Sequence, residues 1–290
     1  MTRLSESAPA KINLTLHVHA RRLDGYHRLE SLVAFSDLAD QLTLDPDQLF
    51  ALCVTGPTAH GSGDLPSNLV TRAALAFAQA FPGSRTGAFC LTKQLPVAGG
   101  IGGGSADAAA ALRLLARLNE ISLDDSRLRK VAQDIGSDVP VCLASQSCMM
   151  LGTGDRLGPA IKLPTLYAVL VNPCVAVETA TVFREMGFAA GENRQCAPHP
   201  DIITSLSQAA LLAALAQGRN DMERAAIRIQ PVIADVLKLL GQQGGVQLAR
   251  MSGSGGTCFA IFETMQGVFD AVRTLRRQRS TWWIQPSVIQ

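Results

Sequence analysis

Apolar and polar side chains alternate near the start of the chain as they do in a half-buried strand. From residue 10 to residue 18 the apolar positions are Ile12, Leu14, Leu16 and Val18, and the polar positions are Lys11, Asn13, Thr15 and His17. Successive side chains of a strand point to opposite faces, so the pattern predicts one strand with Lys11 and Asn13 on a common face. On this pattern alone, Lys11 is a solvated residue of the outer face.

A turn signal directly after this strand predicts a hairpin. The motif Asp24-Gly25-Tyr26-His27 begins with a favoured turn pair, and residues 29–35 form a second apolar stretch. The two strands are therefore expected to pair, with Tyr26 near the rim of the hairpin.

The same periodicities predict the remaining elements. Further strands are expected at residues 41–44, 88–92, 147–151, 166–171, 246–251, 257–263 and 282–284. Helices are expected at residues 69–81, 106–118, 122–135, 179–186, 205–217, 221–242 and 266–279. Residues 53–66 and 152–164 are rich in Gly and Pro and predict loops. The class is α+β, and a boundary in the second loop divides it into lobes of residues 1–158 and 159–290.

Capping signals support several of these helices. Asn68 or Ser67 can cap the first helix, because a short polar side chain there accepts a hydrogen bond from a free N–H group. Ser122-x-x-Asp125 has the form of a capping box at the start of the third helix. Pro231 lacks the donor that a helix interior needs and is expected to bend or interrupt the sixth.

Composition limits the classes of function. The chain has 290 residues with 47% apolar content, enough for a large core, and a formal charge of +2 with no sustained basic face, which argues against a nucleic-acid partner. Its seven cysteines include no CxxC pair, which indicates reduced thiols and a cytoplasmic protein. The lack of a basic face favours a small-molecule partner instead. The sequence shows no signal peptide and no membrane-spanning run.

Residues 96–107 contain the strongest functional signal. Glycine occupies five of the six positions from 99 to 104, between a predicted strand and a predicted helix. Glycine lets backbone N–H groups turn toward one point, and a helix N-terminus adds its positive end, so the loop predicts a phosphate cradle. It lacks the Gly-Lys pair of a Walker A loop, Ser105 stands where a dinucleotide fingerprint needs its third glycine, and protein-kinase signatures are absent.

Several further residues and one further loop allow both a structural and a chemical interpretation. Asp138, in the turn Gly136-Ser137-Asp138-Val139-Pro140, is either a helix cap or the base of a hydroxyl-activating site, in which Lys11 would hold the carboxylate ionised. Tyr26 and His27 are either turn residues without a binding function or a stacking surface for a base or sugar ring. Residues 252–256 form either a hairpin tip or a second loop of phosphate donors.

The motifs taken together resemble a known superfamily. Pro9-Ala10-Lys11-Ile12-Asn13-Leu14, the loop of residues 96–106 and Arg250-Met251-Ser252-Gly253-Ser254-Gly255 are similar to the three motifs of the GHMP kinases. Asp24-Gly25-Tyr26-His27 and the turn around Asp138 resemble the branch that phosphorylates a cytidine diphosphate-linked methylerythritol. The resemblance implies two lobes, an N-terminal one like domain 2 of ribosomal protein S5 and an α/β C-terminal one, with the active site in the cleft between them.

The resemblance also implies roles in binding ATP and Mg²⁺. The phosphates would be held by the loop Pro96, Val97, Ala98, Gly99, Gly100, Ile101, Gly102, Gly103, Gly104, Ser105 and Ala106. Asn68 would lie near adenine. Ser105 and Asp107 are the candidates for contact with Mg²⁺.

Catalysis and substrate binding are implied in the same way. Asp138 matches the catalytic aspartate that takes the proton from the 2-hydroxyl, and Lys11 matches the lysine that orients it. The substrate-binding positions are Asn13, Tyr26, His27, Thr179 and Phe183. Tyr26 and His27 would contact the cytosine end, with Phe183 on the other face of the cytosine. No nucleic acid and no membrane partner is implied.

Three departures and two rivals accompany the resemblance. Ala106 stands where the family commonly has a second serine, Val33 where an aromatic residue is frequent in the cytidine pocket, and Ser137 where alanine is usual. Another member of the superfamily, such as a homoserine or mevalonate kinase, is the nearest rival, and Asp24-Gly25-Tyr26-His27 argues against it. An RNA-binding module is the rival from another class, disfavoured by the weak net charge and the two Gly-rich loops.

Overall fold

Two units make up the chain in the computed structural model, which describes residues 2–202 and 206–290. The first unit comprises residues 2–11, 38–97 and 102–145, and the second comprises residues 12–37, 98–101 and the described residues from 146 onward. Each mixes strands and helices, which confirms the α+β class. The expected lobe boundary after residue 158 stays a prediction.

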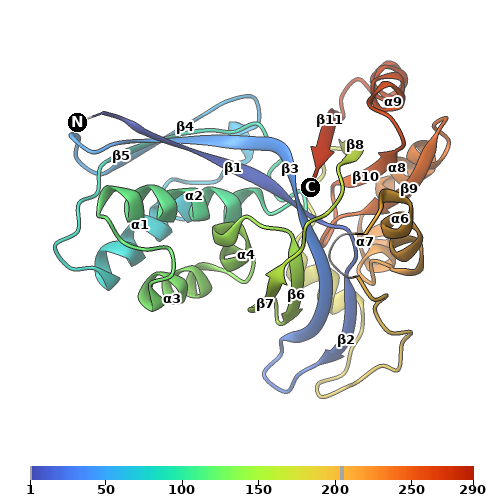
Figure 1. The fold of residues 1–290 in the computed structure, drawn as a ribbon, viewed down its shortest axis with the longest axis horizontal. Helices are drawn as coiled ribbons and strands as arrows, with labels where there is room; N and C mark the ends of the chain where they lie inside the picture. Colours follow the sequence, from blue (N-terminus) through green and yellow to red (C-terminus); the bar gives the residue numbers. More distant parts are fainter. Residues whose placement is uncertain (1, 203–205) are drawn as a thin grey trace. The chain divides into compact units, whose positions relative to one another are not determined.

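A small sheet covered by helices forms the first unit. Its strands are the first part of β1 (Leu4–Asn13), the last part of β3 (His27–Asp45), β4 (Ala51–Thr55) and β5 (Ala88–Thr92). Its helices are η1 (Ala59–Gly61), α1 (Leu69–Ala80), α2 (Gly103–Leu118), α3 (Ser126–Ile135) and α4 (Val139–Ala144). β5 runs antiparallel to β3 and parallel to β4, and Figure 1 shows the α-helices gathered on one face of these strands.

The alternation of β5 explains why the helices cover only that face. Phe89 and Leu91 are buried beneath the helices, whereas Cys90 and Thr92 point to the other face. Helix α2 supplies most of the opposing layer, since its alanines and leucines are buried along nearly its whole length. The strand that leads into the Gly-rich loop is thereby anchored on one side by the core.

Two sets of strands form the second unit. β2 (His17–Arg21), β6 (Cys148–Gly152) and the beginning of β3 pair antiparallel, and β7 (Arg156–Ala160) pairs with β6. β8 (Leu166–Asn172) lies between β10 (Cys258–Phe262) and β11 (Trp283–Ile289), with β9 (Val246–Met251) beside β10. The helices are α5 (Thr179–Glu185), α6 (Gln208–Gln217), α7 (Glu223–Ile229), α8 (Val232–Gly241) and α9 (Met265–Gln278).

The strand predicted over residues 10–18 is wrong in two respects. The chain leaves β1 after Asn13 and enters β2 only at His17, and β1 begins six residues earlier than the pattern suggested, at Leu4. Both sets of alternating side chains are buried, including Lys11, Asn13 and Thr15. Hydrogen bonds replace water for the polar set, as between Asn13 Nδ2 and Ser31 Oγ (2.8 Å). Lys11 is therefore not a solvated surface residue.

Other boundaries also differ from expectation. Helix α2 starts at Gly103, three residues before the predicted start. Asp125, not Ser122, is the N-cap of α3, and its side chain accepts from Arg127 N–H, so the predicted capping box is wrong. Strands β4 and β7 lie in segments predicted as loops.

Several other elements agree with the sequence. β5 has the predicted ends, and the long helix is interrupted at Pro231, which is the N-cap of α8. Residue 205, where another helix was expected to begin, lies outside the described residues, and α6 begins at Gln208. Asn68 caps α1, with its side chain accepting from Val70 N–H at 2.9 Å.

This cap generates a stability prediction. In Asn68→Ala the N–H of Val70 loses its acceptor, so the free energy of unfolding in urea should fall by about 1 kcal/mol. Asn68→Asp keeps an oxygen at the same place and should remain close to the parent protein. An equal loss in both variants would show that the hydrogen bond is not what Asn68 contributes.

Candidate active site

A buried ion pair joins two of the predicted site residues in the first unit. Lys11 lies in β1 with its side chain 3% exposed, and its Nζ is 2.9 Å from Oδ2 of Asp138, whose side chain is 31% exposed. Asp138 occupies the N-cap position of α4, but its side chain makes no capping hydrogen bond. The helix-cap interpretation of Asp138 is therefore wrong, and the carboxylate is held by a lysine while one side of it stays open to solvent.

Gly102 brings this pair next to the start of α2. Its backbone has a φ of +67°, and a Cβ there would lie 3.2 Å from Cε and 3.3 Å from Cβ of Lys11. The absence of a side chain lets the lysine stem run past the helix start. In α2 the first helical hydrogen bond runs from Ala106 N–H to Gly102 O, so the N–H groups of residues 103–105 precede it. Positive helix-end dipoles and the Lys11–Asp138 pair thus lie together.

A second buried charge cluster anchors the chain ahead of the Gly-rich loop. Lys93 Nζ donates to Asp107 Oδ2 at 2.7 Å and also to Asp40, and all three side chains are almost fully buried. Asp40 Oδ1 further accepts from the N–H groups of Gln94 and Leu95. The pairing fixes the backbone immediately before Pro96.

The charges in this cluster do not balance. Burial raises the pKa of Asp107 to about 7, Asp40 adds to the rise, and Lys93 opposes it. Burial opposes the charge of Lys93, but the carboxylates of Asp107 and Asp40 hold its pKa above the ordinary value. Two carboxylates thus share one ammonium group, and Asp107 is the carboxylate that is protonated more readily.

Two glycine-containing loops pack backbone against backbone in the second unit. Residues 98–101 meet residues 252–256 through Thr257 N–H to Gly99 O (2.9 Å) and Ser252 Oγ to Gly100 O (3.1 Å). Gly100 has a φ of +72°, and a Cβ there would lie 2.5 Å from the oxygen of Gly255. The 252–256 segment is therefore a packing partner of the first loop and not an isolated hairpin tip.

Two residues that were not predicted to be catalytic, ATP-binding or substrate-binding residues hold the 252–256 segment in place. Asn220 Nδ2 donates to the carbonyls of Met251 (2.8 Å) and Gly253 (2.9 Å). The buried Arg250 donates to backbone carbonyls of Leu14, Leu215 and Gly218. These roles could not be predicted from the sequence, because the hydrogen-bond partners are backbone carbonyl groups of distant segments. Arg250 stands in one of the three motifs, but the motif does not show what its side chain binds.

Two predicted substrate-binding residues contact the same segment. The N–H of Asn13 donates to Ser252 Oγ at 3.1 Å, and the hydroxyls of Thr179 and Ser254 are hydrogen-bonded at 2.7 Å. Asn13 lies at the end of β1 and Thr179 at the start of α5. Folding thus places both around one loop, although 166 residues separate them in the sequence.

Aromatic rings from the hairpin and from α5 form a cluster in the second unit. The ring of His27 stacks on Phe183, with centroids 4.2 Å apart and an interplanar angle of 13°, and meets Phe188 edge-on at 5.6 Å. Tyr26, 63% exposed, lies next to His27 in the hairpin turn, as predicted. The structure therefore brings His27 and Phe183 together and leaves the ring of Tyr26 accessible to solvent.

His27 is neutral and has hydrogen-bonding capacity to spare. Burial lowers its pKa and the nearby charge of Arg21 lowers it further. Its Nε2 is buried and, within the described part of the chain, has no hydrogen-bond partner. Buried polar atoms are normally satisfied, so this nitrogen is suited to a polar group of a bound ring.

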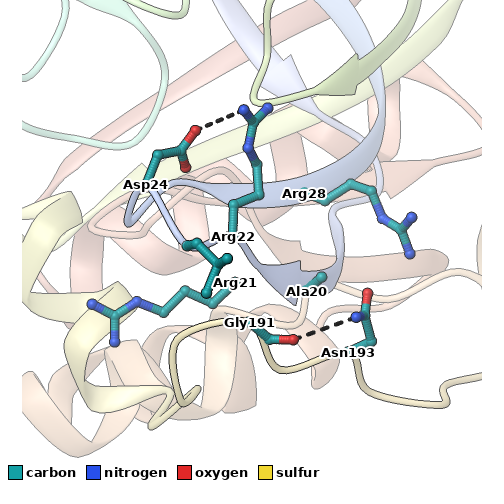
Figure 2. A pocket seen from close by; sticks show the side chains of 8 residues that line it. Ala20, Arg21, Arg22, Asp24, Arg28, Gly191 and Asn193 are labelled. Carbon is teal, nitrogen blue, oxygen red and sulfur yellow. Dashed lines mark hydrogen bonds and ion pairs between the residues drawn. The ribbon is translucent and has the colours of Figure 1, made fainter.

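A cavity of about 710 Å³ lies at the hairpin turn between β2 and β3 and is shown in Figure 2. It is lined by Ala20, Arg21, Arg22, Leu23, Asp24, Arg28, Gly191 and Asn193. Arg22 is paired with Asp24 at 2.6 Å, and Arg21 donates to the carbonyl of Phe188 at 3.0 Å. Figure 2 shows Arg21 and Arg28 extending in opposite directions from the hairpin. Three arginines of the hairpin thus line the cavity, and one of them is paired with a carboxylate.

Val33, one of the three departures, has a structural explanation. Val33 is fully buried in β3 and pairs in register with Cys148 of β6. Ala106 is equally buried in the first part of α2. Both side chains belong to the core, where an added aromatic ring or hydroxyl would have to displace packed neighbours.

The described residues contain no group of three or more His, Cys, Asp or Glu side chains arranged to hold a metal ion. Among the same residues there is no helix long and apolar enough to cross a membrane.

Comparison with known proteins identifies relatives across the whole chain. Residues 68–146 match the model of the GHMP kinases N-terminal domain, and residues 203–278 match that of the GHMP kinases C-terminal domain. A 4-diphosphocytidyl-2-C-methyl-D-erythritol kinase of Methylobacterium radiotolerans is 53% identical over 291 residues, covering 100% of both chains. One of Methylorubrum extorquens is 51% identical over 99% of each chain.

Solved structures show the same similarity. A crystal structure of 4-(cytidine 5'-diphospho)-2C-methyl-D-erythritol kinase matches with a TM-score of 0.76 at 31% identity, over 99% of both chains. A homoserine kinase from Cytophaga hutchinsonii matches with a TM-score of 0.67 at 19% identity, over 99% of this chain and 95% of that one. The second likeness concerns the fold alone.

The Asp107 cluster predicts how stability depends on pH. Because the folded-state pKa of Asp107 lies above its unfolded value, the folded chain binds more protons between about pH 4 and pH 7, and stability falls as pH rises through this window. Asp107→Asn removes the titrating group. It should lessen the difference in unfolding free energy between pH 5 and pH 8 by roughly 2–4 kcal/mol.

Chemical denaturation at both pH values measures this difference. Asp134→Asn, a change at an exposed carboxylate of α3, is the matched control and should leave the pH dependence as in the parent protein. An unchanged pH dependence in Asp107→Asn would show that Asp107 keeps its charge between pH 5 and pH 8. It would contradict the conclusion that Asp107 takes up a proton because it shares Lys93 with Asp40.

Proposed function

Since the chain belongs to the 4-diphosphocytidyl-2-C-methyl-D-erythritol kinases of the GHMP kinase superfamily, we propose that it performs their reaction through the site described above. The reaction is ATP-dependent phosphorylation of the 2-hydroxyl of 4-diphosphocytidyl-2-C-methyl-D-erythritol, giving the 2-phosphate and ADP in the methylerythritol phosphate route to isoprenoid precursors. The observation that carries the site assignment is the Lys11–Asp138 pair beside Gly102.

Asp138 acts as the base in this proposal. Its half-exposed carboxylate takes the proton of the 2-hydroxyl while the oxygen attacks the γ-phosphorus, and the bond from that phosphorus to the β,γ-bridging oxygen breaks, releasing ADP. Lys11 orients the carboxylate. As Asp138 becomes protonated, the ammonium of Lys11 is left to offset charge on the transferred phosphoryl group.

The Gly-rich loop and α2 bind ATP. Phosphate oxygens accept from backbone N–H groups of the loop and of residues 103–105 at the start of α2, where the helix dipole favours negative charge. Asn68 lies at the start of α1 and, in keeping with the resemblance, near adenine. Because its side chain already caps α1, an additional contact to adenine would use the amide nitrogen.

We propose that Mg²⁺ binds together with the nucleotide. Asp107 and Ser105 are the two side chains to compare as its oxygen ligands. Mg²⁺ shields the charge of the phosphates when bound. Asp107 does not fit as its ligand, because this carboxylate is buried and already paired with Lys93, whose ammonium would repel a divalent cation. Ser105, half-buried in the first turn of α2, fits as an oxygen donor that would hold the ion.

The cytidine end is bound by the aromatic cluster. Tyr26 and Phe183 offer ring faces to the cytosine, and the neutral His27 offers its unpartnered Nε2 to a polar edge of the base. Asn13 and Thr179, held around the 252–256 segment, bind the sugar-alcohol part. We further propose a cytoplasmic enzyme, consistent with seven free cysteines.

Acceptor choice tests the function as a whole. The purified chain should release ADP with 4-diphosphocytidyl-2-C-methyl-D-erythritol in a coupled assay and give no comparable rate with homoserine or mevalonate. Mass and phosphorus NMR spectra of the product should place the new phosphate on the 2-hydroxyl. Preferential turnover of either other alcohol would overturn the proposal.

Asp138→Asn tests the base. The amide cannot accept the proton at neutral pH, so kcat should fall by about 10²–10⁴-fold while the affinity for ATP, measured by calorimetry, stays within a few-fold. Asp134→Asn serves as the surface control with parental kcat. Near-parental turnover in Asp138→Asn would exclude this residue as the base.

Tyr26→Ala tests the cytidine site. Loss of a stacking ring should raise KM for the cytidine substrate roughly 5- to 150-fold, with a much smaller change in KM for ATP. Tyr26→Phe keeps the ring and should behave nearly as the parent protein. Equal increases in both KM values would contradict the placement of cytosine on Tyr26.

A further inference from the structure

Two cysteines face each other on neighbouring strands of the first unit. β4 runs parallel to β5, and Cys53 pairs in register with Cys90. Neighbouring strands lie about 4.7–4.9 Å apart, within the range of about 4.4–6.8 Å that the Cα atoms of a disulfide span.

Both thiols lie on the accessible face of the sheet. In β5 the side chains of Phe89 and Leu91 enter the core beneath the helices, so Cys90 between them points the other way and is only half-buried. Cys53 in β4 is exposed. A small reagent in solution can therefore reach the pair without any opening of the core.

We propose that Cys53 and Cys90 form a site of reversible oxidation, at which a peroxide converts the two thiols into one intramolecular disulfide. Neither residue has a part in the phosphoryl transfer described above. The proposal is thus independent of the kinase assignment.

The chemistry proceeds in two steps. The Cys53 thiol loses its proton to water, its sulfur attacks one peroxide oxygen, and the O–O bond breaks to give a sulfenic acid and hydroxide, which takes up a proton. The Cys90 sulfur then attacks the Cys53 sulfur; the S–S bond forms, the S–O bond breaks, and the departing hydroxide leaves as water with the proton from Cys90. Two thiols are oxidised, and one hydrogen peroxide is reduced to two molecules of water.

The environment assigns different roles to the two thiols. Burial raises the pKa of Cys90, and the adjacent Cys53 raises it further, so Cys90 remains a thiol at neutral pH. The exposed Cys53 meets the oxidant first, and Cys90 is in place to resolve the sulfenic acid.

The bond would tie β4 to the strand that leads to the Gly-rich loop. After β4, Gly56 packs so closely on Lys93 that a Cβ there would lie 2.2 Å from its carbonyl oxygen, and Thr58 Oγ1 donates to Leu95 O at 2.8 Å. Together with the paired register from Ala51–Ala88 to Thr55–Thr92, these contacts align β4 and β5 on both sides of the cysteines. The disulfide requires no change of register.

Peptide mapping of the intact enzyme tests the proposal. The folded protein is treated with one equivalent of hydrogen peroxide, remaining thiols are alkylated, and non-reduced digests are analysed by mass spectrometry. The same treatment is given to Cys53→Ser, Cys90→Ser and Cys196→Ser, the last being the control at an exposed cysteine of the second unit.

The main product expected is a peptide pair joined through Cys53 and Cys90, with loss of two thiols per chain and full recovery of both on reduction. This product should persist in Cys196→Ser. In Cys90→Ser, Cys53 should stop at the sulfenic acid, which a dimedone probe captures.

Other outcomes would overturn the proposal. They are retention of both thiols while Cys196 is oxidised, linkage of either cysteine to another chain, or oxidation of Cys53 to the sulfinic acid with Cys90 still reduced. Because the decisive map comes from the unsubstituted enzyme, a variant that fails to fold would not leave the question open.

Discussion

A buried lysine is the constraint on which the catalytic arrangement depends. The ammonium of Lys11 is almost entirely removed from water, which costs several kcal/mol unless a carboxylate accompanies it. Asp138 provides that carboxylate at 2.9 Å and for this reason does not cap α4. The folded state therefore holds base and cation together before any substrate binds, as a preorganised site requires.

Close backbone packing, made possible by glycine, shapes the candidate site residues within each unit. Gly102 leaves room for the stem of Lys11, and Gly100 lets residues 98–101 meet the 252–256 segment with no side chain intervening. Lys93 pairs with the carboxylates of Asp40 and Asp107 and so fixes the backbone just before the Gly-rich loop. Backbone donors held in this way need little reorganisation when phosphates arrive, which is the contribution that phosphoryl transfer asks of a protein.

The sequence predicted what local patterns determine and missed what depends on distant partners. Periodicity identified the helices, and the ends of β5 and the break at Pro231 follow from local chemistry. The alternation around Lys11 indicated a half-buried strand, since nothing local reveals that the polar side chains Lys11 and Asn13 are buried as well. The cluster of Asp40 with Lys93 could not be predicted, since 53 residues separate its members. The site motifs were visible, whereas the contact between Lys11 and Asp138 required the fold.

A structure of the enzyme with a non-hydrolysable ATP analogue and 4-diphosphocytidyl-2-C-methyl-D-erythritol tests the central claim most directly. The account predicts the substrate's 2-hydroxyl within about 2.6–3.2 Å of the Asp138 carboxylate, with the Lys11 ammonium still paired to that carboxylate. A complex in which the 2-hydroxyl lies against another residue, with Asp138 bonded to Lys11 alone and out of reach of the substrate, would contradict it.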